Sequence, residues 1–359
     1  MSPLVLHSPR YLALLAALLL FSFLTPLLAA GFGAAEIGFS QVVDLLLAAM
    51  SGAEPGSEGG SIASRILLEL RLPRILLAFV AGFGLAIAGM VLQTVTRNPL
   101  ADPYLFGISS GASFGAVLVL TLFGGVGIAG SSIAQTLSLS LSQSLSLPLG
   151  AFIGASLSVL LVLALCGRNM STQIERMLLS GVAVSFMFGA LTSLLLYFSG
   201  PQAAASLLFW SLGSFAKASW GSLTLPVVTL VFSTLVILLF KRSIIAMKAG
   251  DETAHTLGVN VQKLRLGMLL LCSLITAVVV AHCGGIGFVG LMIPHMVRLL
   301  LPGQFPLLVT GVVGGLFMIW VDVLARSLLS YQELPIGIIT AVIGSVFFLS
   351  ILVSKRRET

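Results

Sequence analysis

The chain has 359 residues, of which 58% are hydrophobic and 8% charged, with a mean hydropathy of +1.13 and a net charge of +6. A soluble domain is about half apolar and a quarter charged. This composition excludes a stand-alone soluble enzyme, a secreted disulfide scaffold and a nucleic-acid binder. It predicts an all-α integral membrane protein with about ten transmembrane helices, in a single domain over residues 1–359.

Apolar segments of about 20 residues, enough to cross a bilayer as a helix, follow one another along the chain. The first is too long for the core of a signal peptide and precedes an equally apolar chain, so we expect an uncleaved first span. The eighth is shorter and contains Pro294, which predicts a tilted or broken span supported by its neighbours. The predicted spans are 11–30, 66–95, 104–123, 147–166, 177–198, 220–240, 266–281, 288–301, 305–324 and 335–353. Between two of them, the Ser/Leu alternation at 131–146 predicts either a surface helix or a loop.

Basic residues favour one side of these spans. If both termini are cytoplasmic, thirteen of the 18 Lys and Arg residues face the cytoplasm and five face outside, as the positive-inside rule requires. Three of those five, Arg71, Arg74 and Arg326, lie at the outer ends of the second and ninth segments. Either they reach lipid headgroups or they pair with carboxylates of a protein that docks outside.

The longest polar stretch on the cytoplasmic side, 241–265, contains a predicted short helix at about 249–259. Asp251 and Glu252 stand at its start and Gly258 follows its last turn, which are the end signals of a capped helix. A short amphipathic helix held between two spans suits contact with a soluble partner.

Small residues recur at four-residue spacing in two of the spans. Gly107, Gly111 and Gly115 form one such series, and Gly311 and Gly315 form another. This spacing allows helix backbones to approach closely in lipid. We therefore expect a tightly packed bundle of helices.

Two letter patterns match enzyme signatures without their structural context. Residues 107–111 match G-x-S-x-G but open a membrane helix, and residues 285–290 match G-x-G-x-x-G with no strand predicted around them. The sequence contains no H-E-x-x-H, and His282 beside Cys283 lacks a third ligand. We expect neither a catalytic residue nor a bound metal in this chain.

Four ordered motifs give a more specific indication: R-L-P-R at 71–74, QTVTRNPLADPYLFG at 93–107, GGIGFVGLMIPHMVR at 284–298 and E-L-P-I-G at 333–337. Together they resemble the FecCD-type permease subunits of type II ABC importers that take up ferric siderophores, haem and cobalamin in bacteria. The resemblance implies a homodimeric inner-membrane permease that is not itself an enzyme. Its implied partners are two ATP-binding cassette subunits and a periplasmic or surface substrate-binding protein. ATP and Mg²⁺ would bind the ATPase, because this chain has no Walker A sequence, and no cofactor is expected here.

The resemblance also implies roles for individual residues. In the family, arginines of the R-x-P-R motif and one before the E-L-P motif receive glutamates of the binding protein. The N-P-L motif and a Ser-Thr pair before the fifth span form the cytoplasmic gate, and a short cytoplasmic helix contacts the ATPase. The matching positions are Arg71, Arg74 and Arg326 for docking, Asn98, Leu100 and Thr172 for the gate, and Gly250, Asp251, Glu252, Ala254, Leu257 and Gly258 for coupling.

The expected cargo is an iron chelate, a ferric siderophore before haem, with cobalamin as the alternative. A secondary, ion-coupled transporter is the alternative from another class, and such carriers place ionisable residues in mid-membrane as coupling sites. Here Asp322 lies near the outer end of a predicted span, four residues from Arg326, and Glu69 lies at the very start of another, so neither is in mid-membrane. This pattern favours the importer.

Overall fold

The computed structural model describes residues 9–33, 37–51, 58–123, 143–166, 174–199, 201–302, 305–329 and 332–358, and every regular element in this part of the chain is a helix. The elements are α1 (Pro9–Gly31), α2 (Phe39–Ser51), α3 (Glu58–Arg65), η2 (Ile66–Arg71), α4 (Leu72–Val95), η3 (Pro103–Phe106), α5 (Ile108–Phe123), α7 (Gln143–Cys166), α8 (Ile174–Tyr197), α9 (Pro201–Ser211), α10 (Trp220–Leu239), α11 (Lys241–Lys248), α12 (Asp251–Thr256), α13 (Val261–Cys283), α14 (Val289–Leu300), α15 (Leu307–Ser327) and α16 (Ile336–Glu358).

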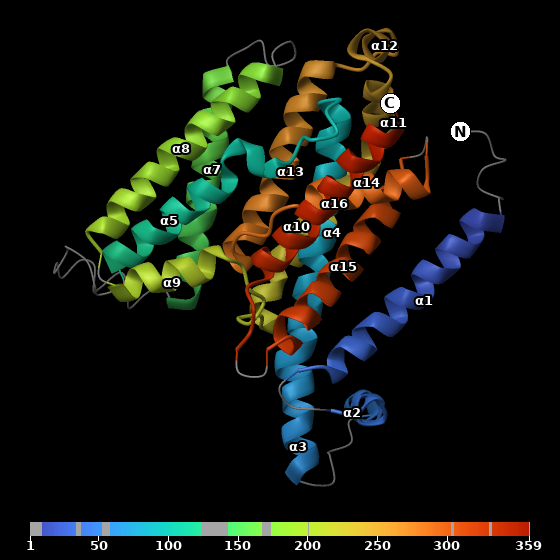
Figure 1. The fold of residues 1–359 in the computed structure, drawn as a ribbon, viewed down its shortest axis with the longest axis vertical. Coiled ribbons are helices and arrows are strands. Elements are labelled where there is room, and N and C mark those ends of the chain that lie inside the picture. Colours follow the sequence, from blue (N-terminus) through green and yellow to red (C-terminus); the bar gives the residue numbers. More distant parts are fainter. Residues whose placement is uncertain are drawn as a thin grey trace.

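The predicted all-α membrane fold is confirmed, because all ten predicted apolar segments lie on helices (Figure 1). In the described residues, six helices are long and apolar enough to cross a membrane, while the apolar parts of α1, α5, α14 and α16 are shorter. Helix α14 has 12 residues around Pro294, as expected for the short eighth segment. The helices α2 and α9, of 13 and 11 residues, were not predicted, since hydropathy alone detects only segments of spanning length. Most of 131–146, and Thr172, lie outside the described residues.

The helices α3, η2 and α4 form one continuous path, in which α4 runs through the middle of the molecule and α3 projects from its lower end (Figure 1). Its apolar stretch has 34 residues and its most apolar window is 83% buried. The segment η2 is a π-helix that ends at Arg71, just before Pro73 in the first turn of α4. The N–H of Leu72 donates to the carbonyl of Leu67, five residues back, so the chain stays hydrogen-bonded although proline has no N–H. Arg71 and Arg74 therefore lie within a helix that continues beyond the predicted end of the span.

Glycines allow neighbouring helices to touch through their backbones. A Cβ on Gly115 would lie 2.0 Å from a carbonyl oxygen of α7, and one on Gly111 would lie 2.4 Å from another. Gly311 of α15 similarly leaves room for the ring of Phe83 of α4, which a Cβ would meet at 2.5 Å. These contacts confirm the packing that the four-residue spacing predicts.

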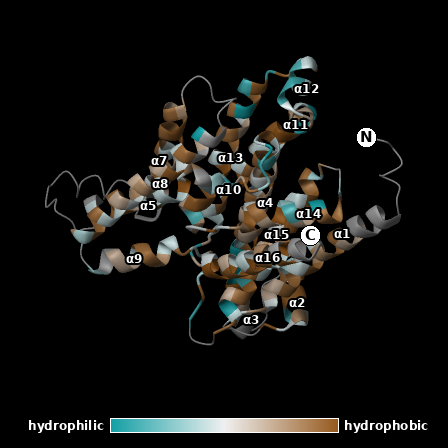
Figure 2. Cartoon of the chain, turned by 45° about the horizontal axis from the view of Figure 1, so that its top comes forward, coloured by the Kyte–Doolittle hydropathy of each residue, from teal (hydrophilic) through white to brown (hydrophobic). Residues whose placement is uncertain are grey.

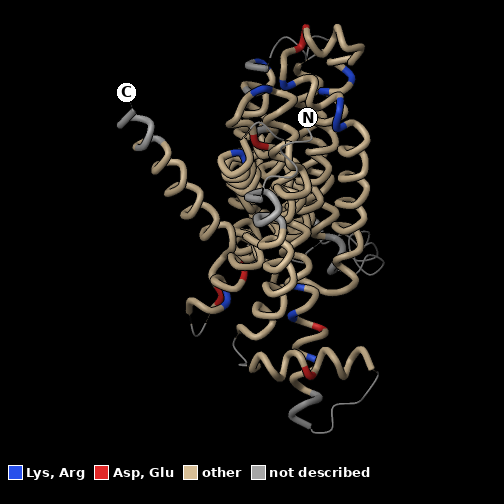
Figure 3. Tube along the Cα trace, turned by 90° about the vertical axis from the view of Figure 1, so that its right-hand side faces the viewer, with Lys and Arg blue, Asp and Glu red and all other residues tan. Residues whose placement is uncertain are grey.

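Charged residues gather at two opposite ends, with an apolar body between them (Figures 2 and 3). We call one the α12 end, which holds α11, α12, the last turn of α4 and the first turn of α13. The other, the α3 end, holds η2, the first turns of α4 and the last turn of α15. Helix α16 extends away from the remaining helices towards the C-terminus (Figure 3). The two ends contain the candidate functional residues.

Candidate functional site

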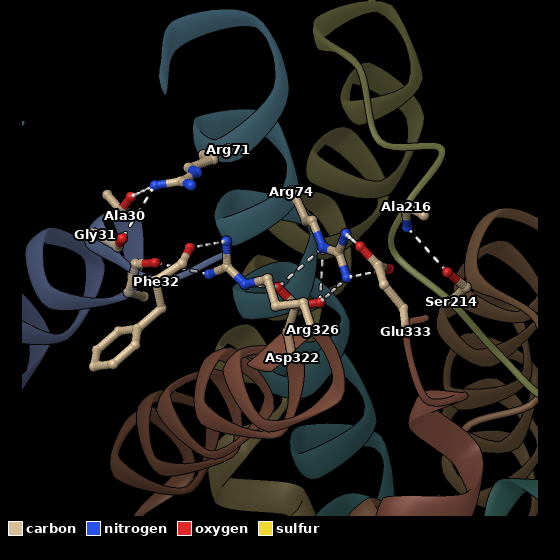
Figure 4. A network of polar contacts seen from close by, with 11 residues as sticks. Ala30, Gly31, Phe32, Arg71, Arg74, Ser214, Ala216, Asp322, Arg326 and Glu333 are labelled. Carbon is tan, nitrogen blue, oxygen red and sulfur yellow. Dashed lines mark hydrogen bonds and ion pairs between the residues drawn. The ribbon is translucent and has the colours of Figure 1, made fainter. Parts of the chain in front are cut away.

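Five charged side chains meet at the α3 end (Figure 4). Arg71 and Arg74 come from the junction of η2 and α4, Asp322 and Arg326 from α15, and Glu333 from the segment before α16. The structure thus brings together the three arginines that the sequence suggested for docking. It adds two carboxylates, which the sequence analysis did not connect with Arg74.

Arg74 is held by both carboxylates. Its Nε donates to the carboxylate oxygens of Asp322 at 2.8 and 3.1 Å, and its two terminal nitrogens donate to Glu333 at 2.8 and 2.9 Å. The side chain is only 11% exposed. Such paired, charge-assisted hydrogen bonds fix a guanidinium in one orientation. Arg74 therefore joins α4, α15 and the segment before α16.

Arg71 and Arg326 bind the C-terminal end of α1. Arg71 donates to the carbonyls of Ala30 and Gly31 at 2.5 and 3.2 Å. Arg326 donates to those of Ala29 and Phe32 at 2.8 and 3.0 Å. A cation at a helix C-terminus satisfies carbonyls that lack partners within the helix. Both guanidinium groups are buried in this single chain, so these two arginines anchor α1 in addition to any docking role.

Glu333 is the solvent-facing member of the cluster, with 45% of its side chain exposed. The segment after it is fixed by backbone bonds, from the N–H of Leu334 to Ala325 and from that of Ile336 to Gly213. The hydrogen bond from Arg74 lowers the pKa of the Glu333 carboxyl, against a smaller opposing effect of burial. Glu333 thus stays ionised and covers the outward side of Arg74.

At the α12 end, α4 ends in a tight turn that carries two of the predicted gate residues. Arg97 has a φ of +50°, a value that non-glycine residues rarely adopt, and it redirects the chain after the last turn. The carboxamide oxygen of Asn98 then accepts a hydrogen bond from the N–H of Leu100 at 2.9 Å. Leu100 is 61% exposed. The turn presents an apolar side chain to its surroundings, which is the geometry a gate residue would need.

An ion pair links this turn to α12. Arg265, in the first turns of α13, is 1% exposed, and its Nη2 donates to both carboxylate oxygens of Asp251 at 2.8 and 3.0 Å. Its Nε donates to the carbonyl of Val95 at 2.9 Å, and Arg97 lies 3.5 Å from Asp251. Arg97 and Arg265 are two of the thirteen basic residues that the positive-inside rule assigns to the cytoplasm, and their interaction with Asp251 was not predicted. The signal available in the sequence was the position of Arg265 directly before the apolar span 266–281.

A short helix, α12, is present within the predicted range 249–259, with Gly250 at its N-cap and Gly258 after it, at φ values of +121° and +80°. Ala254 is buried against the body of the protein, whereas Leu257 is 67% exposed. Beside α12, a groove of about 810 Å³ is lined by Glu252 and the other residues that lead into α13. An exposed apolar side chain next to a groove is suited to contact with another protein.

The motif at 284–298 forms a loop and most of α14 rather than a nucleotide-binding turn. The phenol oxygen of Tyr104 accepts a hydrogen bond from the N–H of Ile286 at 3.0 Å. Gly290 packs directly on α4, where a Cβ on Gly89 would lie 1.9 Å from its carbonyl oxygen. The motif therefore joins α14 to α4 and to the segment before α5. Among the described residues, no group of three or more His, Cys, Asp or Glu side chains is placed to hold a metal ion.

Comparison with known proteins assigns this arrangement to a family. Residues 17–354 match the FecCD transport family. The chain belongs to the FecCD transport family. Similar FecCD relatives are the hemin transport system permease protein HmuU of Yersinia pestis, with 36% identity over 82% of this chain and 84% of that protein, and the cobalamin import system permease protein BtuC of Halobacterium salinarum, with 39% identity over 81% and 74%. A solved metal-chelate type ABC transporter in an inward-facing conformation has a TM-score of 0.78 and 30% identity, over 96% of this FecCD chain and 100% of that chain.

Proposed function

We propose that this FecCD chain is the permease subunit of a binding-protein-dependent ABC importer that moves an iron chelate across the cytoplasmic membrane. The observation that carries the proposal is the link from α12 through Asp251 and Arg265 to the carbonyl of Val95. Force applied to α12 by a partner is transmitted to the last turn of α4. That turn leads directly to Asn98 and Leu100, the proposed cytoplasmic gate together with Thr172.

The α12 end is proposed to face the cytoplasm, with both termini on that side. Two copies of a separate ATPase would bind the groove and the exposed Leu257, and would carry ATP and Mg²⁺. A second copy of the permease would complete the translocation path. The exposed apolar faces of α8 and α16, which include Phe186 and Val346, offer surface for that copy and for lipid.

Docking of a substrate-binding protein is proposed at the α3 end. The cluster holds three arginines and two carboxylates, so its formal charge is +1, and one more carboxylate would balance it. We expect a partner to reach Arg74, because the half-exposed Glu333 covers its outward side and pairs with it there. A glutamate of the binding protein would compete with Glu333 for the same guanidinium.

The proposed cargo is an iron chelate, a ferric siderophore before haem. Cobalamin is the alternative. The similarity to the hemin permease supports iron, the similarity to the metal-chelate transporter supports a chelate without naming its metal, and the similarity to the cobalamin permease supports cobalamin. An ion-coupled carrier is disfavoured because Asp322, the intramembrane carboxylate that it would use, is held by Arg74 at 2.8 Å and lies 3.4 Å from Arg326.

The test is transport by the permease reconstituted in liposomes with its ATPase and binding protein. Labelled ferric siderophore, hemin, cobalamin and free Fe³⁺ are offered separately, with and without ATP. We expect ATP-dependent uptake of one chelate and none of the free ion. Uptake driven by an ion gradient without ATP would contradict the importer, and selective uptake of cobalamin would replace iron chelate as the cargo.

A further inference from the structure

A second cavity opens at the α12 end, apart from the groove beside α12. It has a volume of about 290 Å³ and lies between the last turns of α4, the end of α11, α14 and the segment before α15. Three of its lining residues are the cations Arg97, Lys248 and Arg298, and apolar side chains line it as well, among them Met90 and Phe305. Among the described residues, no carboxylate lines this cavity. Its chemistry is therefore cationic and apolar at once.

Two of the three cations have no anionic partner in the described part of the chain. Arg298 donates to the carboxamide oxygen of Gln93 at 2.5 Å, and Gln93 donates in turn to the carbonyl of Gly290 at 2.9 Å. These bonds orient the guanidinium without neutralising it. Lys248 is exposed at the rim, and no carboxylate of the described residues lies within 4.0 Å of either cation. The third cation, Arg97, lies 3.5 Å from Asp251, and about half of its side chain is exposed. It can therefore interact with Asp251 and with a ligand in the cavity.

We infer that this cavity binds a phosphate group, supplied by the headgroup of an anionic phospholipid. Guanidinium groups match the geometry of phosphate oxygens, and an ammonium adds a point charge. Basic pockets between transmembrane helices on the cytoplasmic side are typical sites for anionic lipid headgroups. The apolar lining accommodates the glycerol and the first methylenes of the acyl chains. The lipid source rests on the proposed orientation of the α12 end, whereas the phosphate chemistry does not.

The position of the cavity couples lipid binding to the gate turn. Pro99, between Asn98 and Leu100, is one of the lining residues. A bound phosphate would contact Arg97 from the cavity, on a side chain that also pairs with Asp251 of α12. A phosphate bound in the cavity therefore stabilises the conformation of the gate turn in which Arg97 faces the cavity.

The experiment uses the full-length permease in a neutral detergent. Native mass spectrometry and thermal melting are measured with short-chain phosphatidylglycerol, with net-neutral short-chain phosphatidylcholine and with inorganic phosphate. We expect phosphatidylglycerol to bind and to raise the melting temperature, and the pair Lys248→Gln and Arg298→Gln to weaken its binding by about tenfold or more, since each cation near the headgroups contributes about 1 kcal/mol. The matched control is Lys241→Gln with Arg242→Gln, which removes two cations of α11 outside the cavity.

Each outcome decides a part of the inference. Binding of inorganic phosphate with the same dependence on the variants supports the phosphate site and assigns free phosphate as its source. An equal loss in the control pair would show general surface attraction and overturn the site. Unchanged lipid binding with a lower affinity for the ATPase would also overturn it, because the cavity would then receive an acidic side chain of that partner. Lys248→Gln alone, which leaves the Gln93 bond intact, repeats the test should the pair fail to fold. None of these readouts depends on transport.

Discussion

Arg74 illustrates how one residue can belong to both the fold and the proposed docking site. Glu333 occupies its two terminal nitrogens from the solvent side, so a partner carboxylate must displace Glu333 or share the guanidinium with it. Replacing Glu333→Gln should free Arg74 and strengthen docking of the binding protein by roughly two- to fivefold, the scale of an exposed ion pair. Binding affinity at low and high salt measures this. If the binding protein docked more weakly on Glu333→Gln and with unchanged affinity on Arg74→Gln, the docking site would have to lie away from Arg74.

A variant of Arg326 tests how α1 is anchored, and its readout is stability rather than docking. Truncation by Arg326→Ala removes two hydrogen bonds to the end of α1 and one of the two cations beside the buried Asp322. Removing one partner of a buried ion pair costs about 3 kcal/mol, so we expect the melting temperature in detergent to fall by several degrees. Arg65→Ala is the matched control, because Arg65 is 77% exposed and pairs with Glu69 alone among the described residues. Equal melting of the two variants would show that α1 is held by its apolar face alone.

At the scale of elements, breaking the link between α12, α13 and α4 should uncouple ATP hydrolysis from transport. The change Asp251→Asn removes an anionic partner of the buried Arg265 and keeps the size of a side chain that also lines the groove beside α12. We expect the ATPase still to bind and hydrolyse ATP, with uptake per ATP reduced by about tenfold or more. Uptake and phosphate release are measured together in liposomes. Glu252→Gln, which removes a charge from the same turn outside this ion pair, should keep its coupling ratio, and an equal loss there would assign the effect to surface charge.

The elements also show which features a sequence can predict. Segments such as 220–240 are apolar for the length of a bilayer, and the signals for α12, with acidic residues first and glycine last, are local, so both were predictable. The partners of Arg74 were not, because Asp322 and Glu333 lie 248 and 259 residues away in the chain. Charge counting predicted Arg71 and Arg326 on the outer side of the membrane, but it could not predict that the carbonyls at the end of α1 bind them within the protein. Nothing in the local pattern at Ile66–Arg71 distinguishes a π-helix from an α-helix.

At the scale of the whole molecule, the proposed gate requires two copies of the chain. Leu100 is 61% exposed in the single chain, and an apolar side chain at the tip of a turn gains most by meeting its counterpart across a dimer axis. Leu100→Cys should therefore crosslink between subunits when the cytoplasmic side is closed and should not when it is open. The native thiols do not compete, because Cys166, Cys272 and Cys283 are buried. Crosslinking is measured by non-reducing electrophoresis of the assembled transporter, with the binding protein and with or without ATP, and the chain with only its native thiols serves as the control. A yield that is the same in every nucleotide state would mean that this turn only packs, and the gate would have to lie elsewhere along the path.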